Sequence, residues 1–180
     1  MPLATARLPI EAIPVVSGAV EIANVPWLRA DADWSWQGTW RSFDTSGPWG
    51  TFRGLRSGLI GDHQVDNACL AIAAVWQMMG GALAEEAVRA GLSTTVWPGR
   101  FEVPRREPIL VLDGAHTPAA AAVLARALAA EFPAERFTVL LGVLRDKDPN
   151  PIASALSPFA REFVAITPPS PRALPAGELV

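Results

Sequence analysis

The sequence Pro108-Ile109-Leu110-Val111-Leu112-Asp113-Gly114-Ala115-His116 decides the fold of this chain. Its apolar run predicts a buried strand, and the alanine-rich segment 117–130 predicts a helix directly after it. Apolar runs at 137–141 and 162–166, with a predicted helix at 151–156 between them, repeat the same order. Continuous apolar strands that alternate with helices are typical of a parallel sheet covered on both faces. We therefore predict an α/β fold.

The first half of the chain follows a different pattern. Large side chains recur partly in period two at Trp34, Trp36, Trp40 and Phe43, which favours strands over a helix. We expect a turn at 44–48, after which the strand pattern starts again. The tryptophans of this region are expected to pack in a core or an interface rather than to stack on nucleic-acid bases.

Two helices are expected after these strands. Asp62 is a candidate N-cap for a helix that runs to about Met78. A shorter helix is expected over 82–90, with Gly91 in the usual C-terminal position. The connector 93–99 then leads into the α/β part and ends in a Pro-Gly turn.

The composition excludes several classes of function. Fifteen basic and 18 acidic residues leave a net charge of −3, so no diffuse positive field would recruit nucleic acid or an anionic membrane. The single cysteine, Cys69, excludes an internal disulfide and a cysteine-rich metal site, and its setting predicts a small buried side chain rather than a nucleophile. No segment approaches the ~20 apolar residues of a membrane span, and the N-terminus does not resemble a signal peptide. We expect a cytoplasmic protein.

Asp113 is the first candidate for chemistry, because it stands where the predicted strand 109–112 ends. In open α/β sheets this edge is where ligands bind. A carboxylate there can accept two hydrogen bonds from a ribose diol, and Gly114 would let a ligand approach the backbone. The alternative is that Asp113 only caps the turn and His116 only caps the helix; the sequence does not decide between these interpretations.

Two further candidates have good structural explanations when each is taken alone. Arg100, in the connector, could clamp a phosphate through its planar guanidinium, or it could be an ordinary surface arginine. Asn67 shares a helical face with His63 and Gln64 and could present its amide to a nucleotide. Alternatively, this polar cluster satisfies the backbone groups at the helix start.

Taken in order, five segments resemble the folylpolyglutamate synthase and dihydrofolate synthase family, a branch of the Mur ligase superfamily. The segments are Gly61-Asp62-His63-Gln64-Val65-Asp66-Asn67-Ala68, Trp97-Pro98-Gly99-Arg100-Phe101-Glu102, Leu112-Asp113-Gly114-Ala115-His116, Gly142-Val143-Leu144-Arg145-Asp146-Lys147-Asp148 and Ser170-Pro171-Arg172-Ala173-Leu174-Pro175. The resemblance runs from about Ser57 to the end of the chain and more loosely over its start. The combination is specific, although no single segment is.

The resemblance implies an ATP-dependent ligase that forms C–N bonds. Members of the family join the carboxylate of dihydropteroate or a folate to the amino group of glutamate through an acyl phosphate, with ATP and Mg²⁺ as cofactors. Carried over by motif, Asn67 would contact the nucleotide, Arg100 would touch its phosphates, Asp113 would hold the ribose, and His116 would lie beside it. The partners implied are these small molecules, with neither nucleic acid nor membrane, and the full-length protein is expected to be a monomer.

The resemblance also implies a domain plan. Residues 1–95 would be the distal part of a central ATPase domain, and residues 96–180 a Rossmann-like C-terminal ligase domain, so that both domains are incomplete. Because the only lysine is Lys147, no phosphate loop of the form G-x-x-x-x-G-K-[ST] and no carbamylated central-domain lysine is possible here. We expect the phosphate loop and the metal ligands to lie upstream of Met1.

The departures from the family pattern shape the functional prediction. The strand-end motif usually continues with Asn-Pro, whereas this chain has Thr117-Pro118; threonine can still cap the helix, but a side-chain amide contact is lost. Lys147 could act near the phosphates or the incoming glutamate, or it could belong to a solvated loop.

We expect no catalytic and no metal-binding residue in the chain, and no turnover by the chain alone. The rival hypotheses are a fragment of a cell-wall Mur ligase and a non-catalytic module that binds a nucleotide or a partner.

Overall fold

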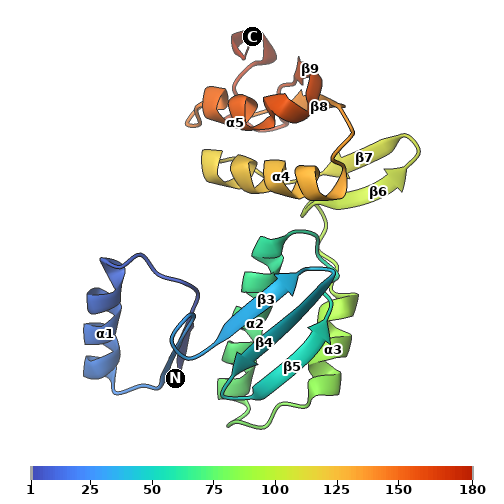
Figure 1. Cartoon of the computed structure of the whole chain (residues 1–180). Coiled ribbons are helices and arrows are strands. Elements are labelled where there is room, and N and C mark those ends of the chain that lie inside the picture. The colour runs from blue at the N-terminus through green and yellow to red at the C-terminus, as the bar shows by residue number, and fades with distance from the viewer. Residues whose placement is uncertain (1, 180) are drawn as a thin grey trace. The chain divides into compact units, whose positions relative to one another are not determined.

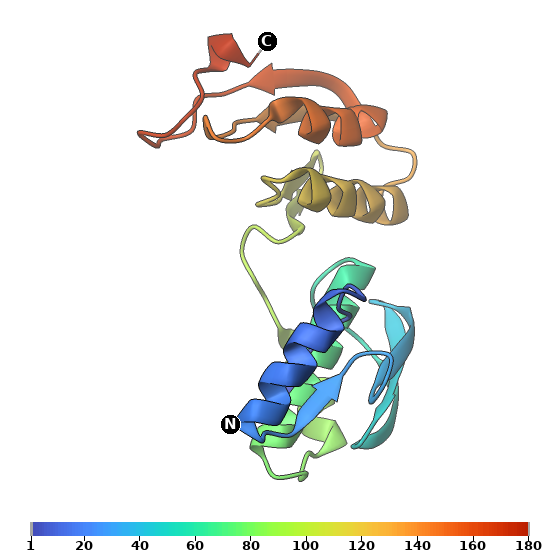
Figure 2. The same ribbon diagram turned by 90° about the vertical axis from the view of Figure 1, so that its left-hand side faces the viewer.

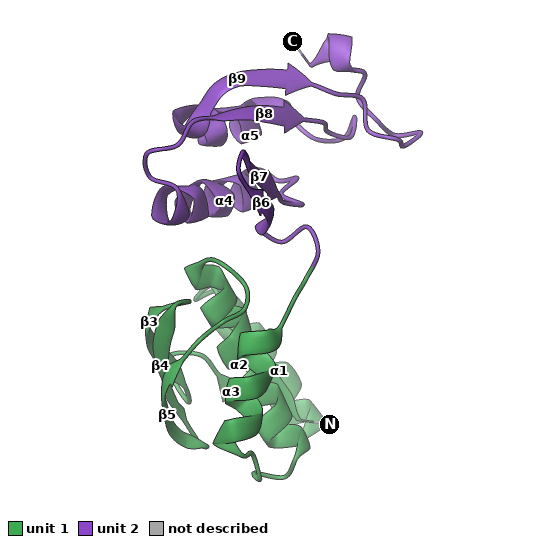
Figure 3. Ribbon diagram, turned by 90° about the vertical axis from the view of Figure 1, so that its right-hand side faces the viewer, with its two compact units in different colours: residues 1–97 green, residues 98–180 purple. Residues whose placement is uncertain are grey.

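The structure is a computed structural model that describes residues 2–179. It divides into two compact units between Trp97 and Pro98, whereas the division expected from the sequence follows residue 95 (Figure 3). Among the described residues, no helix combines the length and the hydropathy needed to cross a lipid bilayer. The two units, residues 1–97 (unit 1) and residues 98–180 (unit 2), are described separately.

Unit 1 begins with a strand–helix–strand arrangement that was not predicted from the sequence. β1 (Leu3–Thr5) and β2 (Trp27–Arg29) are parallel neighbours, and α1 (Ala12–Ala23) connects them. Pro14 disguises the helix, but it lies in the first turn, where a backbone N–H has no partner within the helix. β1 and β2 lie between α1 and the next helix, α2 (Asp62–Met78) (Figures 1 and 2).

An antiparallel sheet follows, formed by β3 (Ser35–Thr39), β4 (Ser42–Gly47) and β5 (Gly50–Leu55). The prediction of strands is confirmed, but the predicted turn at 44–48 is wrong because most of that segment belongs to β4. Its polar side chains bond across the sheet: the Thr45 hydroxyl donates to the Ser35 carbonyl (3.0 Å), and Asp44 Oδ1 accepts from Gly54 N (2.8 Å). The chain instead reverses between Gly47 and Gly50, which face each other across the strands.

The helix α2 has the predicted extent, but its N-cap is Gly61, at a φ of 109°, and Asp62 is the first helical residue. The helix α3 (Glu85–Thr94) continues through Gly91, so the prediction that this glycine ends it is wrong. Beyond Gly91, the Thr94 hydroxyl donates to the Ala90 carbonyl (2.8 Å), one turn earlier on the same helix.

The core of unit 1 lies between the sheet and these two helices. It consists of buried aromatic and aliphatic side chains: Trp34, Trp40, Phe43, Phe52, Leu55, Val65, Ala68, Cys69, Ile72, Ala73 and Val88. Cys69 has no exposed surface, as the sequence predicts, and this burial raises the pKa of its thiol to about 11.

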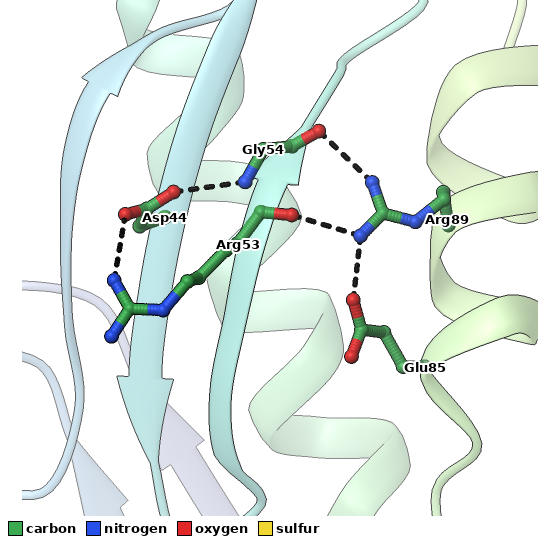
Figure 4. Close-up of polar contacts among 5 residues, drawn as sticks. All are labelled: Asp44, Arg53, Gly54, Glu85 and Arg89. Carbon is green, nitrogen blue, oxygen red and sulfur yellow. Dashed lines mark hydrogen bonds and ion pairs between the residues drawn. The ribbon is translucent and has the colours of Figure 1, made fainter.

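Arg89 fastens α3 to the edge strand β5 (Figure 4). Its guanidinium donates to the carbonyls of Arg53 (2.8 Å) and Gly54 (2.9 Å) and also contacts Glu85 one turn away on α3. These bonds satisfy two carbonyls at the side of β5 that has no neighbouring strand among the described residues.

Unit 2 contains the elements predicted around the strand at 109–112. In chain order they are β6 (Glu102–Arg106), β7 (Ile109–Leu112), α4 (Pro118–Glu131), β8 (Phe137–Leu141), α5 (Pro149–Leu156), the 3₁₀ helix η1 (Ser157–Phe159), β9 (Ala160–Ala165) and the 3₁₀ helix η2 (Ala176–Glu178). α4 packs against α5. Every helix and strand predicted here is confirmed, and the mixed α/β class with them.

The predicted single parallel sheet, however, is not formed by the described residues. β8 and β9 are parallel neighbours, but β7 pairs only with β6, an antiparallel strand that the sequence reading missed (Figure 3). β6 is hard to recognise because its exposed half is Pro104-Arg105-Arg106 rather than an apolar run. None of the residues of these four strands is fully buried.

Candidate functional site

Asp113 joins two segments of unit 2 that are separated in the sequence. It directly follows β7, and its Oδ2 accepts a hydrogen bond from Phe101 N (2.8 Å) while its Oδ1 accepts one from Ala115 N (2.8 Å). Both bonds are charge-assisted and so are roughly twice as strong as neutral ones. Asp113 therefore shapes the turn, and because an ionised carboxylate has about four acceptor positions, it can still receive a hydroxyl from a ligand.

The connector segment is folded against this turn by backbone and side-chain bonds. Gly99 O accepts from Gly114 N (2.8 Å), and Gly99 N donates to Glu102 Oε2 (2.8 Å). Gly99 has a φ of 71°, which favours glycine. The Glu102 carboxylate thus holds the backbone of this segment in place.

Phe101 belongs to this site but was not among the residues predicted for it from the sequence. Its φ is 44°, which is unusual for a large side chain, and its ring is 3% exposed and stacks on Phe132 with centroids 6.3 Å apart. The buried ring anchors the segment, and the Asp113 carboxylate holds the Phe101 backbone. The one signal in the sequence was the position of this aromatic residue directly after Gly99-Arg100.

The start of α4 contributes backbone groups and His116. Thr117 is the N-cap, and its Oγ1 accepts from Ala120 N (3.2 Å), so the prediction that threonine caps this helix is confirmed. His116 is exposed, and its Nδ1 lies 2.8 Å from the Gly114 carbonyl; because a carbonyl only accepts, Nδ1 carries the proton in this contact. The ring is thereby held against the backbone of the turn after β7.

Arg100 extends from the connector as an exposed side chain. Its neighbour Phe101 is tied to Asp113, so the structure brings Arg100, Asp113 and His116 into one group of loops at the carboxyl end of β7. Among the described residues Arg100 has no hydrogen bond or ion pair, which leaves its guanidinium available to an anion.

Asn67, the fourth candidate, belongs to unit 1. It lies exposed on α2, and its Nδ2 donates to Gln64 Oε1 (3.1 Å), while Gln64 Nε2 lies 2.9 Å from His63 Nε2. The three polar side chains therefore bond to one another. The alternative interpretation, that they satisfy backbone groups at the start of the helix, does not account for these side-chain contacts. A role of Asn67 toward a nucleotide stays a prediction.

The loops after β8 and β9 form a second polar group in unit 2. Asp146 bonds to Lys147 (3.1 Å) and to Arg172 (2.8 Å), and these contacts, that with Lys147 first, hold the pKa of Asp146 below its ordinary value. Backbone bonds from Arg145 N to Arg172 O and from Leu174 N to Val143 O, each 2.9 Å, join the same two loops. The predicted segments 142–148 and 170–175 thus meet in space, and Lys147 is paired rather than solvated alone.

Within the described residues, no group of three or more His, Cys, Asp or Glu side chains is arranged to hold a metal ion. The residues that meet at the carboxyl end of β7 are suited to a different ligand. They offer a cation, a carboxylate, an imidazole and the N-terminus of a long helix, which together match a phosphate group and a sugar diol.

Comparison with known proteins gives this arrangement a context. The family described as "Mur ligase, glutamate ligase domain" matches residues 99–180. Folylpolyglutamate synthase of Lacticaseibacillus casei is 33% identical over 184 residues, which cover 97% of this chain and 43% of the relative. Dihydrofolate synthase/folylpolyglutamate synthase of Mycobacterium tuberculosis is 40% identical over 129 residues, covering 69% of this chain and 26% of the relative.

The solved structures agree with the sequence comparison. The structure of Mycobacterium tuberculosis folylpolyglutamate synthase complexed with ADP matches 98% of this chain with a TM-score of 0.89 and 34% identity. The chain spans 41% of the length of that protein.

Proposed function

This chain belongs to the folylpolyglutamate synthase and dihydrofolate synthase family of the Mur ligase superfamily, and we propose that it carries part of the ATP site of a ligase that joins glutamate to dihydropteroate or a folate. The observation that carries the proposal is the pair of hydrogen bonds from Phe101 N and Ala115 N to Asp113. They hold Arg100 and His116 at the ligand-binding edge of an α/β unit. The solved relative with ADP supports the choice of nucleotide.

Each residue of the site has a distinct task in this proposal. Arg100 binds phosphate oxygens through its planar fork and offsets their charge. Asp113 accepts ribose hydroxyls at the positions that its two backbone partners leave open. His116 lies beside the ribose. The contact of Asn67 with a nucleotide is a separate proposal, taken from the family motif. ATP supplies the phosphoryl group that activates the substrate carboxylate before the amino group of glutamate attacks it.

The chain alone does not complete this reaction in our proposal. Its residues 1–95 correspond to the distal part of the ATPase domain and residues 96–180 to the ligase domain, and the sequence has no G-x-x-x-x-G-K-[ST] loop. Positioning the phosphates and Mg²⁺ accounts for most of the catalysis of phosphoryl transfer. No cluster of His, Cys, Asp or Glu side chains in the described part of the chain is arranged to hold Mg²⁺.

Titration of the 180-residue chain with a fluorescent ATP analogue tests the nucleotide site. We expect Arg100→Ala to weaken binding about tenfold, because a charge-assisted contact to phosphate is lost. Arg126 is the matched control, since it is an exposed arginine on α4 without a bond among the described residues. Equal affinity of the wild type, Arg100→Ala and Arg126→Ala would refute the site and favour a module that only packs against a partner.

A second experiment tests the predicted lack of turnover. The chain is incubated with ATP, Mg²⁺, glutamate and either dihydropteroate or a reduced folate, and ADP and the amide product are measured. We expect neither above background. Release of ADP coupled to amide formation would refute the incomplete site but not the nucleotide contacts.

The cytoplasmic location and the monomeric state of the full-length protein stay predictions.

A further inference from the structure

The backbone on either side of Arg100 has an unusual conformation. Gly99 has a φ of 71° and Phe101 a φ of 44°, so both neighbours of Arg100 lie in the left-handed region. Glycine adopts this region without cost, but a large side chain such as that of Phe101 rarely does. A costly backbone conformation persists only where the surrounding contacts impose it, and such residues cluster at functional sites. The contacts of Phe101 therefore have to outweigh this cost.

Hydrogen bonds fix both neighbours of Arg100. The Gly99 N–H donates to Glu102 Oε2, and the Gly99 carbonyl accepts from the backbone of the turn after β7, each at 2.8 Å. The Phe101 N–H donates to Asp113 Oδ2, also at 2.8 Å. The Arg100 side chain, by contrast, is exposed and has no hydrogen bond or ion pair in the described part of the chain. A free guanidinium thus extends from a fixed backbone, which is the arrangement of a preorganised ligand-binding group.

The ring of Phe101 is held by Phe132, which directly follows α4. The two rings stack with centroids 6.3 Å apart and an interplanar angle of 13°. Phe101 is 3% and Phe132 is 7% exposed, so their contact excludes water. Stacked aromatic pairs contribute free energy beyond that of the apolar area they bury. This contact therefore offsets the cost of the left-handed backbone at Phe101.

Phe132 is itself fixed by its surroundings. Its backbone N–H donates to the Leu128 carbonyl at the end of α4 (2.8 Å). The rings of Phe132 and Phe137 meet edge to face with centroids 5.9 Å apart, and the Arg106 guanidinium lies 5.9 Å from the centroid of the Phe132 ring. A ring packed on several sides has little freedom to move. Phe132 therefore gives Phe101 a rigid support from a distant part of the sequence.

We infer that Phe101 and Phe132 are positioning residues for the phosphate contact of Arg100. The buried stack keeps the backbone of Phe101 in its left-handed conformation, and this conformation directs the preceding Arg100 side chain toward the nucleotide phosphates. Without the stack, the segment gains conformations in which Arg100 points elsewhere, and the apparent affinity falls with the population of the competent one. Both rings are buried, so they act through Arg100 rather than on the ligand. The inference rests on the proposed function, which supplies the phosphate.

Binding of a fluorescent ATP analogue and of the matching adenosine analogue to the 180-residue chain tests this role. Phe132→Leu keeps a large apolar side chain but removes the ring. We expect it to weaken binding of the ATP analogue about fivefold and to leave the adenosine analogue unchanged, because only the phosphates depend on Arg100. Phe101→Gly tolerates the left-handed backbone but lacks the ring, and it should have the same effect. The control Phe163→Leu replaces a 40% exposed ring on β9 and should change neither affinity.

The double variant Arg100→Ala/Phe132→Leu separates a positioning role from a structural one. If Phe132 acts through Arg100, its replacement costs no further affinity once Arg100 is alanine. Equal weakening of both analogues, or an undiminished effect of Phe132→Leu in the Arg100→Ala background, would show that the stack only stabilises unit 2 and would overturn the inference. Unchanged binding of the ATP analogue by Phe132→Leu would overturn it as well.

Hydrogen exchange without nucleotide distinguishes failure of this inference from failure of the proposed function. We expect Phe132→Leu to accelerate exchange of the amides of residues 99–102 about tenfold, and Phe163→Leu to have no effect there. Unchanged exchange in Phe132→Leu would refute the hold of the stack on this segment, even where Arg100→Ala weakens nucleotide binding. Accelerated exchange, together with equal binding of ATP by Arg100→Ala and the wild type, would instead refute the phosphate contact on which the inference rests.

Discussion

Replacing Asp113 by asparagine is expected to release the connector from the turn after β7. The carboxylate accepts from Phe101 N and from Ala115 N, each at 2.8 Å. Asparagine keeps a single oxygen, and its NH₂ group would point a donor at the other N–H. The shape of the side chain is unchanged, so the effect isolates these hydrogen bonds.

The magnitude follows from the loss of one charge-assisted bond and the weakening of the other. A hydrogen bond to a charged group contributes about 1.5–3 kcal/mol. Asp113 is exposed, so we take the lower part of this range and expect about 2 kcal/mol less free energy for local opening. Since about 1.4 kcal/mol is a factor of ten, the amides of Phe101 and Ala115 should exchange about 30-fold faster.

Hydrogen exchange followed by mass spectrometry is the suitable assay, because all seven tryptophans lie in residues 1–97 and their fluorescence does not report on unit 2. The matched control is Asp148→Asn. Asp148 caps α5 by accepting from Asn150 N (3.0 Å), and asparagine caps a helix as well as aspartate does. If Asp113→Asn accelerates exchange no more than Asp148→Asn, the carboxylate does not hold the connector.

Three further predictions concern stability and reactivity. Arg89→Ala should lower the free energy of unfolding of unit 1 by about 1–2 kcal/mol, because two β5 carbonyls lose a donor. Urea unfolding followed by tryptophan fluorescence measures this loss. The control is Arg53→Ala, which removes only an exposed 3.6 Å ion pair, and an equal effect of this change would contradict the prediction. In the native chain, Cys69 should react with a disulfide reagent at pH 8 at least about 100-fold more slowly than in urea. The reason is that burial raises the pKa of its thiol from 9.0 to about 11. Rapid labelling of the native chain would show that the thiol is accessible. Because the pKa of Asp146 is lowered in the native chain, this carboxylate contributes to stability above its ordinary pKa of 3.8, and the contribution is lost as the pH falls through the lower native pKa. In Lys147→Gln, an NMR titration should show a higher pKa of Asp146. An unchanged pKa would exclude Lys147 as the main cause of the lowering.

Local patterns predicted the elements of unit 2 well. The apolar runs at 109–112 and 137–141 are strands, and Thr117 caps the helix that the alanine-rich segment forms. These features depend on neighbours within a few residues, so they can be predicted from the sequence without the fold. α1 was missed for the same reason: Pro14 is a helix breaker in most positions, and only its place in the first turn makes it acceptable.

The candidate site was predictable as a set of residues but not as an arrangement. Arg100, Asp113 and His116 carry the expected chemical groups, and their order along the chain indicates the family. The bond from Phe101 N to Asp113 joins residues 12 positions apart, and the stacking of Phe101 on Phe132 joins residues farther apart still, so neither contact follows from the local sequence.

Periodicity and short motifs were enough to predict the α/β class, most helices and strands of unit 2 and the resemblance to a folate ligase. They did not predict which strands pair. β7 took the antiparallel β6 as its neighbour and left its other edge and that of β8 without a strand among the described residues. Strand pairing is decided by contacts distant in the chain, and periodicity along one strand does not specify the strand beside it.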